Sequence, residues 1–289
     1  MTPTRLGAVG YLNARPLVYG LDRLPRFDIR YDVPAECARL LHEGVIDVGL
    51  IPSIEYLRGG PYRMVPGLAI ASRGPVASVA LYTTRAIEDV RSISMDTSSR
   101  TSVALVRVLC ARLYKIRPVI EARGPDLADM LAHSDAALII GDNALFLDHA
   151  AIRPPVRPVG EESRDAAGRR RSAEGGELPG IEKIDLGAAW MTMTGLPFVY
   201  ACWVGRPQAM VPGGVDALQQ ACRAGLANID AISRDYFPTS VDKQAIGAAY
   251  LRDNIKYHLG DQERAGLELF FRYASETGVV PTANAPSFY

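Results

Sequence analysis

The chain has 289 residues, of which 48% are hydrophobic and 22% charged, a composition typical of globular proteins and a length that suits two lobes. Basic and acidic residues number 32 each, so no global field attracts nucleic acid or an anionic membrane, and neither is expected as a partner. An anionic small molecule would have to be bound by local donors.

The amino-terminal residues predict a cytoplasmic protein. The apolar run Leu6–Val9 is too short for a signal peptide, and no stretch approaches the roughly 18 apolar residues of a membrane span. The four cysteines are far apart, and Cys37, Cys110 and Cys222 stand in helical patterns among apolar residues. We therefore expect buried thiols, no metal and no cofactor.

Strands and helices alternate along the first 140 residues. Strands are predicted at residues 6–9, 27–33, 47–51, 68–72, 78–83, 92–95, 118–121 and 136–140. Helices are predicted at residues 34–44, 52–56, 100–114 and 125–133. Such alternation indicates an α/β fold with mostly parallel sheets.

The pattern stops between residues 152 and 184. This stretch is rich in glycine and charge and has no apolar period, so it is expected to be a solvated, mobile loop. Three arginines within it stand among acidic residues without aromatic neighbours, which disfavours a nucleic-acid site. Order resumes with a helix capped by Asp185, a strand at 197–204, and helices at 215–232, 245–257 and 261–277.

The order of these elements predicts two lobes. The first comprises residues 1–83 and 200–289 and includes the C-terminal helices, and the second comprises residues 84–199 with the charged loop. Two crossovers, near 78–84 and 197–204, suit hinge closure around a ligand.

Four polar segments follow predicted strands, where open α/β sheets bind ligands. They are residues 11–16, 52–53, 96–102 and 141–143. In the third, free N–H groups and hydroxyls at a helix start would form a neutral anion socket. A helix cap rich in serine and threonine is the alternative, although capping needs only one hydroxyl.

Single residues in these segments have two interpretations each. Asn13 could stabilise its own turn or act in catalysis, and Arg15 could be a surface charge or the partner of a substrate carboxylate. Asp142 could cap the helix that follows it or belong to the site. Common catalytic motifs such as GxSxG, HExxH and the P-loop are missing, and all four histidines fall near predicted helix ends.

The segment Val9-Gly10-Tyr11-Leu12-Asn13-Ala14-Arg15-Pro16-Leu17 resembles the opening of the chorismate dehydratases of the futalosine route to menaquinone. Further blocks at 74–78, 98–102, 140–145 and 185–199 resemble that family in the same order. The resemblance implies a two-lobed fold like the type II periplasmic binding proteins. It also implies that chorismate loses water to give 3-[(1-carboxyvinyl)oxy]benzoate.

The resemblance also assigns the site by position. Asn13 and Ser78 match catalytic residues of the family. Residues that match or are expected to contact the substrate are Ser99, Arg100, Thr101 and Ser102, which form the carboxylate-holding turn, together with Ser53, Gly141, Asp142 and Arg15.

Dehydration of chorismate is driven by the aromaticity gained, so orientation and charge placement matter more than a strong base. With no histidine in the motifs, the substrate's own enolpyruvyl carboxylate is the expected base. The ring carboxylate would lie in the turn at 99–102, and Asn13 and Ser78 would orient the second carboxylate and the departing hydroxyl.

Two other functions stay open. A sister family makes 1,4-dihydroxy-6-naphthoate on the same fold but characteristically opens with a Cys-Pro-Asn-Asp motif and uses a cleft histidine, whereas this chain has Tyr11-Leu12-Asn13-Ala14. A non-catalytic cytoplasmic protein that binds a carboxylate is the second alternative. A homodimer is compatible with the sequence but not indicated by it.

Overall fold

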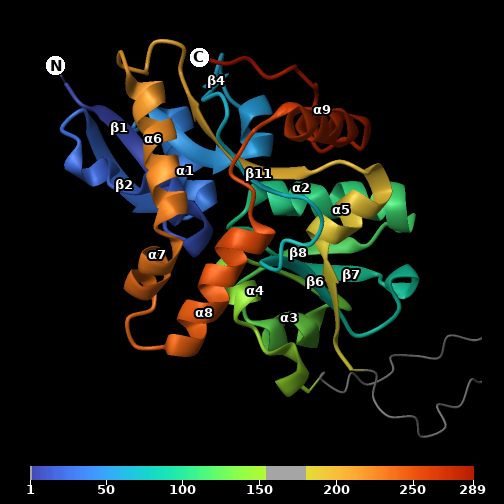
Figure 1. The fold of residues 1–289 in the computed structure, drawn as a ribbon. Helices are drawn as coiled ribbons and strands as arrows, with labels where there is room; N and C mark the ends of the chain where they lie inside the picture. The colour runs from blue at the N-terminus through green and yellow to red at the C-terminus, as the bar shows by residue number, and fades with distance from the viewer. Residues whose placement is uncertain (1, 154–179) are drawn as a thin grey trace, which may run out of the picture.

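Two mixed sheets form the centre of the computed structural model, which describes residues 2–153 and 180–289 (Figure 1). The first has the strand order β2-β1-β3-β11-β4, with β5 paired to β11, and the second has the order β10-β6-β9-β7-β8. The strands of the first sheet are β1 (Thr4–Val9), β2 (Phe27–Asp32), β3 (Val48–Pro52), β4 (Arg63–Met64), β5 (Ile70–Ser72) and β11 (Phe198–Gly205). Those of the second are β6 (Val79–Thr83), β7 (Ser92–Asp96), β8 (Val119–Arg123), β9 (Ala136–Ile140) and β10 (Glu182–Asp185).

Parallel pairing is confined to the part of each sheet that is built by strand–helix alternation. Strand β1 runs parallel to β2 and β3, and β7 runs parallel to β8 and β9. Strands β11, β6 and β10 pair antiparallel with their neighbours. The sheets are mixed because the strands next to the two connections between the sheets, β6, β10 and β11, run antiparallel to their neighbours.

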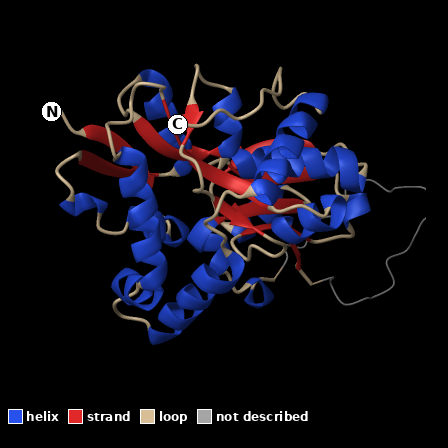
Figure 2. Ribbon diagram, turned by 45° about the horizontal axis from the view of Figure 1, so that its top comes forward, coloured by secondary structure: helices blue, strands red, loops and turns tan. Residues whose placement is uncertain are grey.

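Helices lie outside the strands of both sheets (Figure 2). They are α1 (Pro34–Glu43), α2 (Arg100–Leu109), α3 (Leu127–His133), α4 (Gly141–Leu145), α5 (Leu186–Thr194), α6 (Gly214–Ala227), α7 (Ile229–Tyr236), α8 (Val241–Ala249) and α9 (Asp261–Glu276). Shorter helical segments are η1 (Leu12–Val18), η2 (Leu21–Arg23), η3 (Ser53–Leu57), η4 (Ile87–Asp89), η5 (Cys110–Tyr114), η6 (His149–Ala151) and η7 (Tyr250–Asn254). As predicted, α1 begins at Pro34 and ends before Gly44, whose φ of 80° places it in the left-handed region.

Three predictions about these elements were wrong. The sheets were expected to be mostly parallel, but antiparallel pairs outnumber parallel ones because β6, β10 and β11 pair antiparallel. The single helix expected at 215–232 is broken at Asn228, where the backbone leaves the helical region and the side-chain amide donates to the Ala224 carbonyl. A short polar side chain that satisfies the end of a helix in this way favours its termination. Strand β10 lies in a stretch that was expected to be loop. Residues 154–179 of that loop fall outside the described residues.

The core runs through both lobes. Its largest fully buried side chains include Trp190, Trp203, Phe198 and Phe270, which come from α5, β11 and α9. The four cysteines are free and buried, as predicted for three of them. Within the described ranges, no helix is long and apolar enough to cross a membrane. The chain passes from the first sheet to the second over residues 73–78 and returns over 186–197, whereas the lobe limits at 83/84 and 199/200 stay a prediction.

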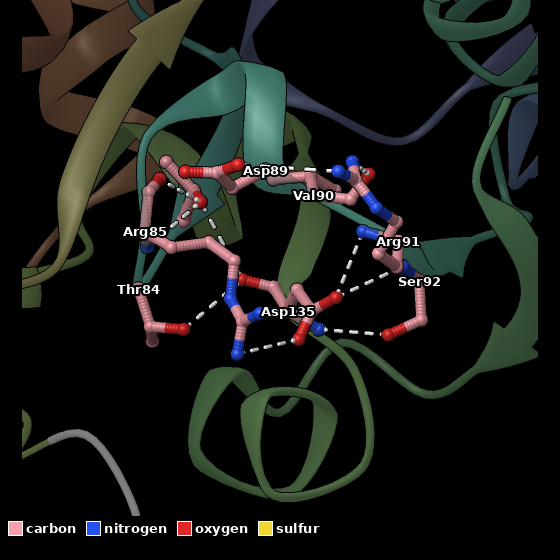
Figure 3. Close-up of polar contacts among 8 residues, drawn as sticks. Thr84, Arg85, Asp89, Val90, Arg91, Ser92 and Asp135 are labelled. Atoms are coloured by element: carbon pink, nitrogen blue, oxygen red, sulfur yellow. Dashed lines mark hydrogen bonds and ion pairs between the residues drawn. The ribbon is translucent and has the colours of Figure 1, made fainter. Parts of the chain in front are cut away.

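One end of the central strands of the second sheet is fixed by a buried carboxylate (Figure 3). Asp135, 5% exposed, accepts hydrogen bonds from the backbone N–H groups of Arg91 and Ser92 at 2.8 and 3.1 Å. It also pairs with Arg85 at 3.1 Å. These contacts join the turn before β7 to the start of β9 and so fix the strands whose other ends face the ligand cavity.

Candidate active site

A small cavity lies between the two sheets, at the ends of strands from both lobes. Its lining residues are Val9, Tyr11, Asn13, Pro34, Pro52, Ile70, Val76, Ser78, Val79, Ser99, Ser102, Ile140, Gly141, Tyr200 and Ala201. Its volume of about 50 Å³ is well below the roughly 300 Å³ or more typical of ligand pockets. A ligand with a six-membered ring therefore needs the lobes to move apart before it can bind.

Asn13 reaches the cavity from η1, directly after β1. Its Oδ1 atom is buried and has no hydrogen-bond partner among the described residues, and its backbone carbonyl accepts from the Tyr257 hydroxyl at 2.9 Å. A turn-stabilising asparagine would use its side-chain oxygen within the turn. The unused oxygen instead favours a role toward a ligand, because buried polar groups are almost always paired.

Ser78 lies across the cavity at the start of β6 and is 1% exposed. The preceding Ala77 has a φ of 64°, a conformation that non-glycine residues rarely adopt. The carboxylate of Asp185 holds it there by accepting from the N–H groups of Val76 at 3.0 Å and Ala77 at 2.7 Å. Backbone strain maintained by surrounding contacts is typical of functional sites.

The start of α2 forms the third wall. Ser99 and Ser102 line the cavity, and their hydroxyl oxygens are 3.0 Å apart. Ser99 occupies the N-cap position but makes no side-chain capping bond, so first-turn N–H groups stay available to a ligand. This arrangement supports the predicted anion socket over the capping alternative.

Three further predicted residues make contacts within the protein instead of lining the cavity. The Ser53 hydroxyl donates to the Val199 carbonyl of β11, in the same sheet as β3, at 2.8 Å and lies 3.4 Å from the Thr101 hydroxyl oxygen of the other lobe. The Thr101 hydroxyl accepts from the N–H of Ile54 at 3.2 Å. Arg100 points away from the cavity and donates to Glu55 at 2.8 Å. These contacts hold the start of α2 against η3.

Glu55 is the centre of a charged cluster. Its side chain is 1% exposed and accepts from Arg58 at 2.7 Å, Arg100 at 2.8 Å and His42 at 3.0 Å. Burial by itself would raise the pKa of Glu55. The hydrogen bonds from His42 and Arg58 and the charges of the two arginines outweigh that effect and lower the pKa to about 2. Glu55 is therefore ionised at neutral pH and ties the second lobe to the first.

Asp142 also bridges the lobes, behind Gly141. It accepts from the N–H of Leu12 at 3.3 Å and from the Tyr236 hydroxyl at 2.5 Å, while burial raises its pKa. Gly141 lines the cavity with a φ of 64°, and a Cβ there would lie 3.1 Å from the Tyr11 ring. Both features favour glycine at this position.

Arg15 does not reach the cavity. Its guanidinium carbon lies 5.0 Å from the Tyr31 ring centroid and 5.1 Å from that of Tyr236, and its Nη2 donates to the Gly10 carbonyl at 3.2 Å. These cation–π contacts hold the turn that carries Asn13. Arg15 thus supports the site from behind in this structure.

The cavity is neutral. None of its described lining residues is an aspartate, glutamate, lysine, arginine or histidine. The described part of the chain also holds no cluster of three metal-binding side chains. What the lining offers is hydroxyl groups, one amide, backbone N–H groups and apolar surface. Such a site can orient an anion and stabilise charge that moves within it, but it supplies no ordinary acid or base.

Sequence reasoning missed three residues of this site. Tyr200 lines the cavity, Tyr250 bonds to Ser78, and Glu55 anchors α2. Tyr200 and Tyr250 stand in apolar runs that indicate core, and Glu55 opens a short helix where an exposed charge is expected. No local pattern distinguishes them.

The fold is similar to those of solved structures at low sequence identity. A crystal structure of an Archaeoglobus fulgidus protein is 13% identical with a TM-score of 0.69, covering 96% of this chain and 99% of that one. The periplasmic aliphatic sulphonate binding protein of Escherichia coli is 15% identical with a TM-score of 0.57, covering 98% and 95%. The fold is thus the two-lobed one of periplasmic binding proteins, with the cavity where the lobes meet.

Sequence comparison identifies the family. Residues 4–276 match the menaquinone biosynthesis family. The chorismate dehydratase of Thermus thermophilus is 33% identical over 275 residues, covering 93% of this chain and 94% of the relative. The chain belongs to the menaquinone biosynthesis family.

Proposed function

We propose that the chain is a chorismate dehydratase, a hydro-lyase that converts chorismate to 3-[(1-carboxyvinyl)oxy]benzoate and water. The near full-length similarity to the Thermus thermophilus enzyme supports it. The observation that carries the proposal is a neutral cavity in which Asn13, Ser78 and the start of α2 converge. The family match and this relative together also support the broader statement that the chain is an enzyme of menaquinone biosynthesis.

The neutral lining suits a reaction in which the substrate supplies its own base. The enolpyruvyl carboxylate would take the proton from the ring carbon that bears the ether, and charge would delocalise toward the ring carboxylate. First-turn N–H groups and the hydroxyls of Ser99 and Ser102 would stabilise that carboxylate. Departure of the neighbouring hydroxyl then completes the aromatic ring.

Asn13 and Ser78 would hold the departing hydroxyl and the second carboxylate from the opposite side. Because these contacts strengthen as the hydroxyl leaves, they contribute to the rate more than to binding. The ring-carboxylate contacts already exist in the bound substrate, so they contribute to both.

Two variants test this division of roles. Asn13→Ala should lower kcat, by about tenfold or more, with little change in KM, whereas Ser102→Ala should raise KM as well. His133→Ala is a suitable control because His133 lies near the protein surface at the end of α3, outside the cavity. A full loss of activity in that folded control would contradict a scheme without a histidine base.

The sister activity is tested in the same assay by offering cyclic dehypoxanthine futalosine as substrate. The described cavity lining lacks the histidine that the sister family is expected to use. A binding protein without catalysis would bind chorismate and leave it unchanged.

A further inference from the structure

Tyr250 lies directly behind Ser78, outside the cavity lining. It begins η7, a π-helical turn that continues α8, and it is 3% exposed. Its hydroxyl oxygen is 2.7 Å from the Ser78 oxygen. Turns of this type insert one residue into a helix and are frequent at functional sites. The C-terminal helices thus contribute to the site in the first half of the chain.

The hydroxyl groups of Tyr250 and Ser78 are within hydrogen-bond distance of each other, and either oxygen can donate by its position alone. A phenol is the more acidic of the two hydroxyls and therefore the better donor. The Tyr250 proton is accordingly directed to the Ser78 oxygen. Ser78 in turn has its own proton free for the cavity.

Asn13 offers the cavity an acceptor, because its Oδ1 atom is buried and has no hydrogen-bond partner in the described chain. Burial raises the pKa of Tyr250, so the phenol stays protonated at neutral pH and can donate to Ser78.

We propose that Tyr250 is a positioning residue that sets Ser78 as a donor toward the ligand, beside the Asn13 oxygen, which is an acceptor. A donor beside an acceptor matches an alcohol, which both accepts and donates. If the proposed function holds, the alcohol that the Ser78 hydroxyl and the Asn13 oxygen bind is the hydroxyl group that leaves chorismate. As its carbon–oxygen bond breaks, the electron pair moves to the oxygen held by Ser78. The proton removed from the ring carbon completes the water molecule.

Tyr250→Phe removes the hydroxyl and keeps the ring. We expect kcat for chorismate to fall about tenfold or more while KM changes less than about threefold. Tyr82→Phe is the matched control, because Tyr82 is fully buried in β6 and its hydroxyl donates to the Ala144 carbonyl at 3.4 Å, away from the cavity. Its kcat should stay within about twofold of the wild-type value.

A double-mutant cycle separates positioning from general support of the fold. If Tyr250 acts through Ser78, Tyr250→Phe should cause little further loss of kcat in a Ser78→Ala background. Equal losses in both backgrounds would overturn the inference, as would an unchanged kcat in the single variant. Should Tyr250→Phe fail to fold, Tyr250→Met serves instead, since it also removes the hydroxyl and its side chain adapts to an apolar site. It should show the same fall in kcat, and a wild-type kcat would overturn the inference.

The wild-type protein is measured in the same series. No turnover of chorismate by the wild type would overturn the proposed function and this inference with it. If the wild type turns over chorismate and Tyr250→Phe keeps the wild-type kcat, the role of Tyr250 would be overturned while the proposed function would stand.

Discussion

Replacing Glu55 by glutamine tests the charged cluster that joins the lobes. Glu55 is held by Arg58, Arg100 and His42 at 2.7, 2.8 and 3.0 Å, and these partners lower its pKa from the ordinary 4.5 to about 2. A difference of this size corresponds to about 3 kcal/mol of unfolding free energy at neutral pH. Glu55→Gln should lose an amount of this order.

The pH dependence gives the sharper test. Because the pKa of Glu55 is lower in the folded state, its contribution is full above pH 4.5 and is lost as the pH falls toward 2. Urea unfolding at pH 7 and pH 3 should show the difference between wild type and Glu55→Gln shrinking to roughly half.

A control separates this effect from charge removal in general. Glu36 pairs with Arg39 at the surface, so Glu36→Gln should change the unfolding free energy little at either pH. A Glu55→Gln variant as stable as wild type at pH 7 would refute the reasoning. So would a loss that stays constant between pH 7 and pH 3.

Two further predictions concern the backbone around the cavity. Asp126→Ala removes only a helix cap and should cost about 1 kcal/mol, whereas Asp185→Ala also releases the loop before β6 and should cost about 3 kcal/mol or more and lower kcat. Equal losses in chemical unfolding would contradict this. Gly141→Ala and Gly20→Ala both place alanine at positive φ, at about 1 kcal/mol each. Only the former crowds Tyr11, so only it should raise KM for chorismate, and equal KM values would exclude that contact as the cause.

Much of the fold could be predicted because local patterns carry it. Alternating apolar runs and helix caps predicted the strands of both sheets except β4 and β10, and Pro34 and Gly44 bounded α1 correctly. The antiparallel pairing of β6, β10 and β11 could not be predicted, since the direction of each strand depends on how segments far apart in the sequence return to the sheet. The break at Asn228 depends on a single side chain within an otherwise helical pattern.

The sequence predicted which segments form the site, but not which side chains within them face the cavity. Asn13, Ser78, Ser99, Ser102 and Gly141 all line the cavity. Ser53, Arg100, Thr101, Asp142 and Arg15 lie near the same strand ends. Their side chains are used in contacts with β11, between the lobes or behind the turn. A motif places a loop at the end of a strand, but the packing of the opposite lobe decides which side chains face the ligand.

Incubation of the purified wild-type protein with chorismate tests the central claim most directly. Absorbance and mass measurements should show chorismate converted to a product lighter by one water, with the spectrum of a substituted benzoate. Because the described residues that line the cavity include no carboxylate, imidazole or thiol that could hold a metal ion, turnover should not depend on an added metal. Chorismate that is bound but recovered unchanged would contradict the account.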